Sequence, residues 1–210
     1  MFCTECGKKL QPETKFCGNC GHEVNKPVDE EDRGVPLSSE TLLQLINSSI
    51  QSGKPLCLPE ANLKGAHLVN ADLSSANLVN ANMREADLRW ANVTKANMRE
   101  ADLRWANLHK ADLTKANLTE ADLHGAWLGG AFLSGADLYG AWLGGTILSG
   151  ADLHGANLWK ADLGGANLSD TNLSDANLTR ANLTDAKYNA NTKWSEDFDP
   201  VAAGAVLVED

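Results

Sequence analysis

A five-residue unit, Ala-(Asp/Asn)-Leu followed by two variable residues, repeats from Ala61 to Ala190 without an insertion or a deletion. Every fifth residue from Ala61 is Ala except Thr146 and Thr171, and the residue two positions later is Leu except at Met83, Val93, Met98 and Tyr188. A period of five matches neither the 3.6-residue period of an α-helix nor the two-residue period of a long flat strand. The chain must therefore turn once in every unit.

The order of residues inside the unit predicts which side chains face inward. In a short extended segment the first and third side chains point to one face and the middle one to the other. Ala and Leu therefore face inward, and Asp or Asn faces outward. If each unit turns by about a right angle, four units close a square coil, and coils stack at the strand spacing of ~4.8 Å. The sequence predicts a mainly β, parallel solenoid filled by Leu and Ala.

The twenty-six tandem units, about 130 of 210 residues, resemble the pentapeptide-repeat proteins. The resemblance implies a right-handed quadrilateral β-helix. It also implies one specific role, because some family members resemble B-form DNA and regulate or protect DNA gyrase. That role is associated with a continuous acidic face and a C-terminal dimer contact. Residues 61–190 carry eleven Lys and Arg against fourteen Asp and Glu, so the gyrase role is the alternative hypothesis here.

Two Cys-x-x-Cys pairs separated by ten residues form a four-thiolate metal signature: Cys3, Cys6, Cys17 and Cys20. Each pair is followed by Gly, which suits the tight turn that brings backbone amides to the sulfurs. Two disulfides are the alternative, and the cytoplasmic location expected below argues against them. Four protein ligands leave no position for water, so we expect one structural Zn²⁺. The segment resembles short N-terminal zinc ribbons of bacterial proteins.

Changes of pattern divide the chain into five parts. We expect a zinc ribbon at 1–22, a flexible acidic linker at 23–37, a capping α-helix at 38–53, the solenoid at 54–190 and a C-terminal cap at 191–210. The helix begins at Ser38 or Ser39, has apolar residues at helical spacing and ends at Gly53. Its expected role is to cover the open end of the Leu core.

Two further expectations concern the ends of the solenoid. Cys57 takes an outward middle position and is expected to be an edge residue that binds no metal. Trp194 and Phe198 are expected to fold over the last coil. The Tyr-x-x-x-Thr-x-Trp and Phe-Asp-Pro ending is similar to tails of cyanobacterial pentapeptide-repeat proteins.

The net charge of −10 is spread over the chain as −3 in residues 1–60, −3 in 61–190 and −4 in 191–210. This balance favours solubility and argues against avid nucleic-acid binding. No apolar run approaches the ~18 residues of a membrane span. The first residues lack the pattern of a signal peptide. We therefore expect a cytoplasmic protein without a membrane segment.

Basic residues collect at the corner positions of neighbouring units, namely Arg84, Arg89, Arg99 and Arg104, with Lys95, Lys110 and Lys115 nearby. Arg84, Arg89 and Arg104 are candidate partner-binding residues. Glu85, Glu100 and Glu120 lie among them, so a solvated surface of ion pairs is the alternative interpretation.

Aromatic residues collect in the glycine-rich tract from Gly125 to Gly165. Trp127, Phe132 and Trp142 occupy outward middle positions, and Tyr139 and Trp159 occupy corners. Large exposed aromatic side chains on a flat surface are typical of binding hot spots. The alternative is that these side chains stack on one another and on the Gly corners.

Nothing in the sequence indicates catalysis. The outward Asp and Asn residues are expected to accept hydrogen bonds from turn amides, and no His lies beside a nucleophile at a repeated spacing. A filled solenoid also lacks a substrate cleft. The leading hypothesis is a non-catalytic scaffold, without a small-molecule substrate, that presents the sides of a rigid rod to an unidentified protein partner. The zinc ribbon is a second recognition module, and the oligomeric state stays open.

Overall fold

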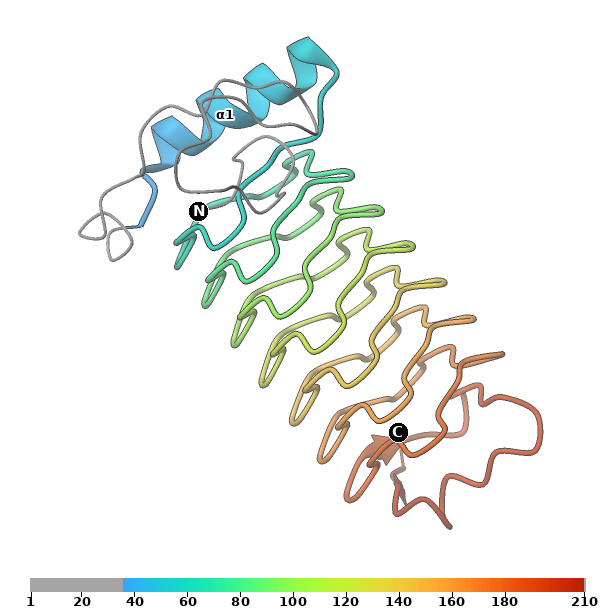
Figure 1. Cartoon of the computed structure of the whole chain (residues 1–210). Helices are drawn as coiled ribbons and strands as arrows, with labels where there is room; N and C mark the ends of the chain where they lie inside the picture. The colour runs from blue at the N-terminus through green and yellow to red at the C-terminus, as the bar shows by residue number, and fades with distance from the viewer. Residues whose placement is uncertain (1–35, 210) are drawn as a thin grey trace, which may run out of the picture.

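The computed structural model describes residues 36–209, and the repeat forms a stack of four-sided coils (Figure 1). The outward middle residue of each unit forms a parallel bridge with the residue twenty positions later, from Cys57 with Asn77 to Asn167 with Lys187. A last bridge joins Asn172 to Lys193. Four five-residue units therefore make one coil, as the sequence predicts.

Each side of a coil is held to the next coil by main-chain hydrogen bonds. The amide of Leu63 donates to the carbonyl of Asn82 (2.7 Å), and the amide of Asn82 donates to the carbonyl of Ala61 (2.9 Å). The amide of Gly65 donates to the carbonyl of Arg84 (2.8 Å). The same pattern recurs from unit to unit, so regular backbone pairing along the rod stabilises the coil.

The corners are tight four-residue turns whose third residue has a positive φ. The amide of Ala66 donates to the carbonyl of Leu63 (3.0 Å), and Gly65 between them has φ 66°. A positive φ at this place is the signature of a type II turn. Non-glycine residues adopt it as well, for example Trp90 at φ 61° and Glu120 at φ 57°.

We number the faces by their first outward residue: face 1 begins at Cys57, face 2 at Asn62, face 3 at His67 and face 4 at Asp72. Each corner takes the number of the face that precedes it. Corner 2 therefore joins face 2 to face 3, and residues twenty apart in sequence stack on one face or one corner.

The core consists of the inward Ala and Leu residues, most of which are fully buried in the central coils. Thr146 and Thr171, the two exceptions to the small Ala position, are also buried. Their hydroxyls donate to the carbonyls of Leu143 (2.7 Å) and Leu148 (2.9 Å). A buried hydroxyl that is hydrogen-bonded carries little penalty, which explains why Thr fits there.

Helix α1 (Ser39–Ser52) lies across the N-terminal end of the rod (Figure 1). The side chain of Ser38 accepts from the amide of Thr41 (3.2 Å), and Gly53 ends the helix at φ 65°. Leu42 and Ile46 are 1% and 4% exposed and join the core cluster. The helix therefore extends the hydrophobic core over the first coil.

The C-terminal segment closes part of the opposite end. Strand β1 (Lys187–Tyr188) pairs in parallel with strand β2 (Val206–Leu207). Trp194 packs edge-on against Tyr188 at 5.4 Å between ring centres and stacks on Phe198 at 5.2 Å. Trp194 and Phe198 pack against the core cluster, as expected for a cap.

The five cysteines divide between the first coil of the solenoid and residues outside the described range. Cys57 takes the middle position but is only 8% exposed, and it accepts from the Nδ2 of Asn77 at 3.6 Å. It takes the expected edge position, on the first strand of face 1, and is buried there. The expected zinc ligands Cys3, Cys6, Cys17 and Cys20, and nearly all of the acidic linker, lie outside the described residues.

Candidate partner-binding surface

The outward Asp and Asn side chains have structural bonds. The Oδ1 atom of Asp72 accepts from the amide of Ser74 (3.0 Å) and from the Nδ2 of Asn92 on the next coil (3.1 Å). The Oδ1 atom of Asp152 likewise accepts from the amide of His154 (3.2 Å) and from the Nδ2 of Asn172 on the next coil (2.8 Å). These residues cap turns and link coils, which explains why the repeat carries them.

Trp127, Phe132 and Trp142 occupy the same outward position and cannot accept such bonds. Their side chains are 56%, 51% and 62% exposed. Within residues 36–209, no group accepts a hydrogen bond from the amides two residues further on, at Gly129, Ser134 and Gly144. These three aromatic residues therefore lack the turn bond of the repeat and leave a large apolar side chain in water.

The three residues do not form one flat surface, contrary to the sequence-based interpretation. Trp142 lies on face 2, Trp127 on face 3 and Phe132 on face 4. A unit advances the chain by one face, so aromatic residues that are close in sequence are spread around the rod. A single flat partner cannot contact all three.

Tyr139 and Trp159 share corner 1, because they are twenty residues apart, and their rings stack at 4.9 Å with an interplanar angle of 28°. The ammonium of Lys160 lies 4.3 Å from the centre of the Trp159 ring, and the guanidinium of Arg180 lies 5.8 Å from it. For this pair, the structure shows the mutual stacking that the sequence left as the alternative.

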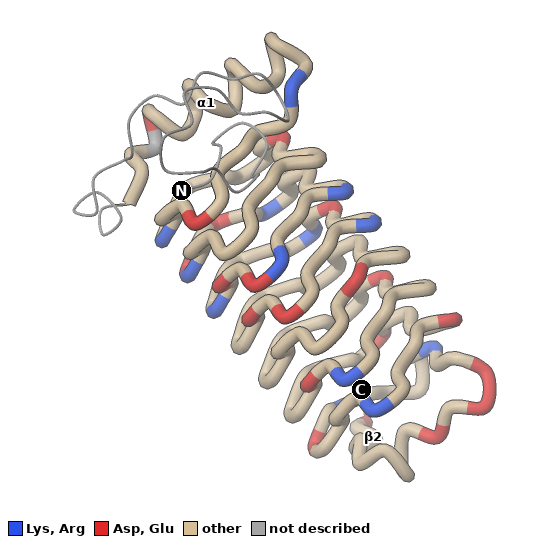
Figure 2. The backbone as a smooth tube through the Cα atoms, in the orientation of Figure 1, with Lys and Arg blue, Asp and Glu red and all other residues tan. Residues whose placement is uncertain are grey.

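Lys and Arg residues are concentrated in the coils nearest α1 (Figure 2). Most of the predicted arginines there have a carboxylate partner. Arg89 lies 2.6 Å from Asp87, Arg99 lies 3.1 Å from Glu100, and Arg104 bonds Asp102 and lies 3.4 Å from Asp122. The ion-paired surface that the sequence left as the alternative is present at these positions.

The two Asp-Arg pairs alter the acidity of their carboxyl groups. The side-chain hydrogen bond from Arg89 lowers the pKa of Asp87. Burial acts to raise the pKa of Asp102, but the side-chain and backbone hydrogen bonds from Arg104 outweigh burial, so the pKa of Asp102 is also lowered. Both groups are held as carboxylates.

Arg84 differs from these arginines, because its guanidinium lies 5.0 Å from the centre of the Trp105 ring on corner 2. Its Nε atom is buried and has no hydrogen-bond partner within the described chain. On corner 3 the ammonium of Lys110 lies 4.6 Å from the centre of the Trp90 ring. Trp90 and Trp105 are 54% and 51% exposed, and the sequence-based search did not select them.

A duplication in the sequence is the signal that identifies these two tryptophans. The twelve residues Ala-Asn-Met-Arg-Glu-Ala-Asp-Leu-Arg-Trp-Ala-Asn occur at 81–92 and again at 96–107. The offset of fifteen residues is three units of a four-unit coil. The Asp, Arg and Trp residues of the first copy therefore lie at corner 3. Those of the second copy lie at the adjacent corner 2.

Some glycine corners lie beneath large side chains of the preceding coil, whereas a Cβ atom at Gly150, Gly155 or Gly165 would meet nothing within 4 Å. A Cβ atom at Gly125 would lie 2.7 Å from the Cδ1 atom of Trp105. At Gly129 and Gly144 it would lie 3.3 Å and 3.1 Å from the Nδ1 atoms of His109 and His124, which come from the preceding coil. These glycines make room for large corner side chains one coil earlier.

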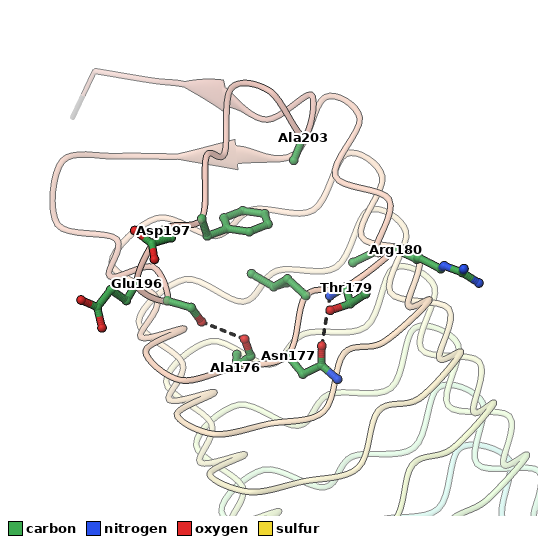
Figure 3. Close-up of a pocket in the computed structure, with 11 residues that line it drawn as sticks. Ala176, Asn177, Thr179, Arg180, Glu196, Asp197 and Ala203 are labelled. Carbon is green, nitrogen blue, oxygen red and sulfur yellow. Dashed lines mark hydrogen bonds between the residues drawn. The ribbon is translucent and has the colours of Figure 1, made fainter.

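A cleft of about 460 Å³ lies between the last rung of face 1, residues 176–181, and the segment 195–203 (Figure 3). Ser195 donates to the carbonyl of Ala176 (2.8 Å) at its edge. Within the described chain, the amides of Leu178 and Arg180 have no acceptor, because residues 195–203 leave the coil path. None of the predicted site residues lines this cleft.

Residues 36–209 hold neither a metal-binding cluster nor a membrane-spanning helix. Among them, no group of three or more His, Cys, Asp or Glu side chains is arranged to hold a metal ion. In this range the helix present lacks the length and apolar character that a transmembrane span requires.

Comparison with known families identifies the repeat. A model of pentapeptide repeats matches in eight copies, at residues 57–94, 96–135, 133–170 and 161–187. The chain belongs to the pentapeptide-repeat family. A zinc-ribbon domain model matches residues 2–24, which include all four cysteines predicted as ligands. Comparison with curated protein sequences found no significant match.

Several solved structures are similar to the chain. HetL of the cyanobacterium Nostoc sp. strain PCC 7120, involved in regulating heterocyst differentiation, is 30% identical. The match covers 73% of this chain and 78% of HetL, with a TM-score of 0.49. The plasmid-mediated fluoroquinolone resistance protein QnrB1, in a trypsin-treated form, is 20% identical over 72% of this chain and 84% of that one, with a TM-score of 0.44.

A third similar structure is Rfr23 of the cyanobacterium Cyanothece 51142, a pentapeptide-repeat protein. It is 27% identical over 63% of this chain and 87% of its own, with a TM-score of 0.28. The assignment to the family depends on the match of the repeats themselves.

Proposed function

We propose that the protein is a non-catalytic interaction scaffold, whose solenoid presents lateral surfaces to a protein partner. The observation that carries this proposal is the exposure of Trp127 and Trp142, at 56% and 62%, in positions where the repeat has Asp or Asn. The substitution removes a turn-capping acceptor and exposes apolar surface, so it contributes nothing evident to the fold. Exposed Trp residues on a rigid surface are typical interaction hot spots.

The zinc ribbon supplies the second recognition module in this proposal. The match of a zinc-ribbon model to residues 2–24 supports one structural Zn²⁺ held by Cys3, Cys6, Cys17 and Cys20. Four thiolate ligands saturate a tetrahedral ion, so the metal would stabilise the segment and not react. Whether the ribbon or the solenoid contributes more to partner binding is decided by the experiment below.

Affinity purification with the full chain tests the proposal. Trp127→Asn and Trp142→Asp restore the repeat consensus, so the double variant should keep or increase its stability while it loses the partner. Trp159→Ala is the matched control, because it removes a stacked tryptophan from corner 1. A Cys3→Ser and Cys6→Ser variant tests the ribbon. Identical partner lists for wild type and the consensus variant would contradict the assignment of these tryptophans.

A DNA-mimicking regulator of gyrase would need a continuous acidic face. The outward residues of face 1 include one Asp among Asn residues, and faces 2 to 4 are interrupted by Trp142, Trp127 and Phe132. The charge distribution therefore does not support this alternative. A supercoiling assay with DNA gyrase should show no effect at high protein excess, and inhibition or protection would restore the alternative.

A further inference from the structure

We propose that face 3 and its two corners bind an acidic segment of the partner protein. We call this surface the tryptophan face and define it by Trp90, Trp105, Trp127, Arg84 and Lys110. The inference rests on the proposed function, since it names the face of the scaffold and the chemistry of its partner.

The three tryptophans frame one side of the rod. Trp105 lies on corner 2, just before the strand residue Asn107, and Trp90 lies on corner 3, just after the strand residue Asp87. Asp87 and Asn107 are bridged, and Asn107 is bridged in turn to Trp127. Trp90 and Trp105 therefore flank neighbouring strand segments of face 3. Trp127 lies on the following segment of face 3, between corners 2 and 3.

This face combines exposed aromatic surface with fixed cations. Each of the three tryptophans is more than half exposed, at 54%, 51% and 56% for Trp90, Trp105 and Trp127. Arg84 lies over the ring of Trp105 and Lys110 over the ring of Trp90. A cation held on an aromatic ring keeps its charge at a defined place, so a carboxylate that approaches face 3 meets a positive charge at both borders.

The other cations of these two corners are paired with carboxylates. Lys64 lies 3.6 Å from Glu85, Arg89 is paired with Asp87, and Arg104 is paired with Asp102 and Asp122. Within residues 36–209, no carboxylate lies within ion-pair distance of Arg84 or Lys110. Charge complementarity therefore selects an acidic segment as the occupant.

The tryptophan face is preorganised. His109 packs edge-on against Trp90 at 6.3 Å between ring centres, and His124 packs against Trp105 at 6.4 Å. The indole of Trp105 also covers Gly125. Side chains already fixed in this way lose less rotamer freedom when a partner binds.

Single-stranded nucleic acid is also bound by aromatic rings and cations. The chain carries a net charge of −10, and Asp87 on face 3 and Asp102 beside corner 2 are held as carboxylates. These charges oppose any long polyanion that follows the rod, including a nucleic-acid strand. A short acidic peptide needs only the two cations at the borders, so the observations favour a protein segment.

Titration of the full chain with a short oligoglutamate peptide, followed by tryptophan fluorescence, tests the inference. We expect binding that weakens with added salt and falls by about tenfold in the Arg84→Gln, Lys110→Gln variant, because two charge pairs are lost. Lys95→Gln, Lys115→Gln is the matched control on corner 4, with the same change of charge. It should bind like wild type.

Three outcomes of these titrations would overturn the inference. The first is absence of oligoglutamate binding, and the second is an equal loss of affinity in the two variants. The third is tighter binding of a thymidine oligonucleotide than of the oligoglutamate peptide, which would assign the face to nucleic acid. If partner capture depends on Trp127 and Trp142 but not on Arg84 and Lys110, the inference fails while the scaffold function stands.

Discussion

The guanidinium of Arg84 lies 5.0 Å from the centre of the Trp105 ring, although the two residues are twenty-one positions apart in the sequence. They are neighbours because one coil brings residues about twenty positions apart onto the same corner. The surface of this protein is therefore organised along the rod axis. A substitution on one coil should therefore affect the packing of side chains on the next coil.

Gly125→Ala tests the packing between coils. A Cβ atom at Gly125 would lie 2.7 Å from the indole of Trp105, whereas Gly155 has the same backbone conformation and nothing within 4 Å. Both Ala variants add backbone strain of about 1–2 kcal/mol at a positive φ. We expect Gly125→Ala to lose more stability in urea unfolding and to shift the tryptophan emission. Equal losses in both variants would contradict the contact with Trp105.

Leu118→Ala tests the central core. Leu118 is fully buried, and stacked coils on both sides limit how far its neighbours can move to fill the space it would leave. The expected loss is about 2–5 kcal/mol in the free energy of unfolding. Ala121→Leu should also destabilise, by about 1–3 kcal/mol, because the small position has no space for added volume. Leu43→Ala on the exposed side of α1 is the control and should change stability little.

The pH dependence of stability tests the Asp87 and Asp102 pairs. Both pKa values are lowered below the ordinary 3.8, so the two groups stabilise the fold above that pH and lose their contribution as the pH falls further. An Asp87→Asn, Asp102→Asn variant should be less stable than wild type at neutral pH. The difference should vanish in acid, measured by denaturant unfolding at a series of pH values. A difference independent of pH would refute the ionic origin.

Removal of zinc tests the N-terminal assignment. Metal analysis of the full chain should find one zinc ion, which Cys17→Ser should abolish and Cys57→Ser should retain. Chelation should change the spectroscopic signal of the ribbon without moving the unfolding transition of the solenoid, because Ala and Leu burial and coil-to-coil hydrogen bonds hold the solenoid. Loss of zinc in Cys57→Ser would place the fifth cysteine in the site.

The strict period of five is sufficient to predict the coil, because volume and polarity alternate with it. Ala and Leu can only face inward, and the Gly, Asn and other turn residues follow at a fixed phase. The positions of α1 and of the aromatic C-terminal cap could also be predicted, since a solenoid must cover its two ends. A periodic pattern encodes this kind of fold directly, without long-range information.

Which outward side chains meet depends on how the coils stack. Trp127, Phe132 and Trp142 form a compact group in the sequence but lie on three faces, because each unit turns the chain by one face. Trp105 contacts Arg84 and covers Gly125 because residues about twenty positions apart lie on neighbouring coils. The rotamer that makes both contacts depends on the packing of those coils. Side-chain neighbours across coils are set by stacking and packing, and the local sequence does not contain them.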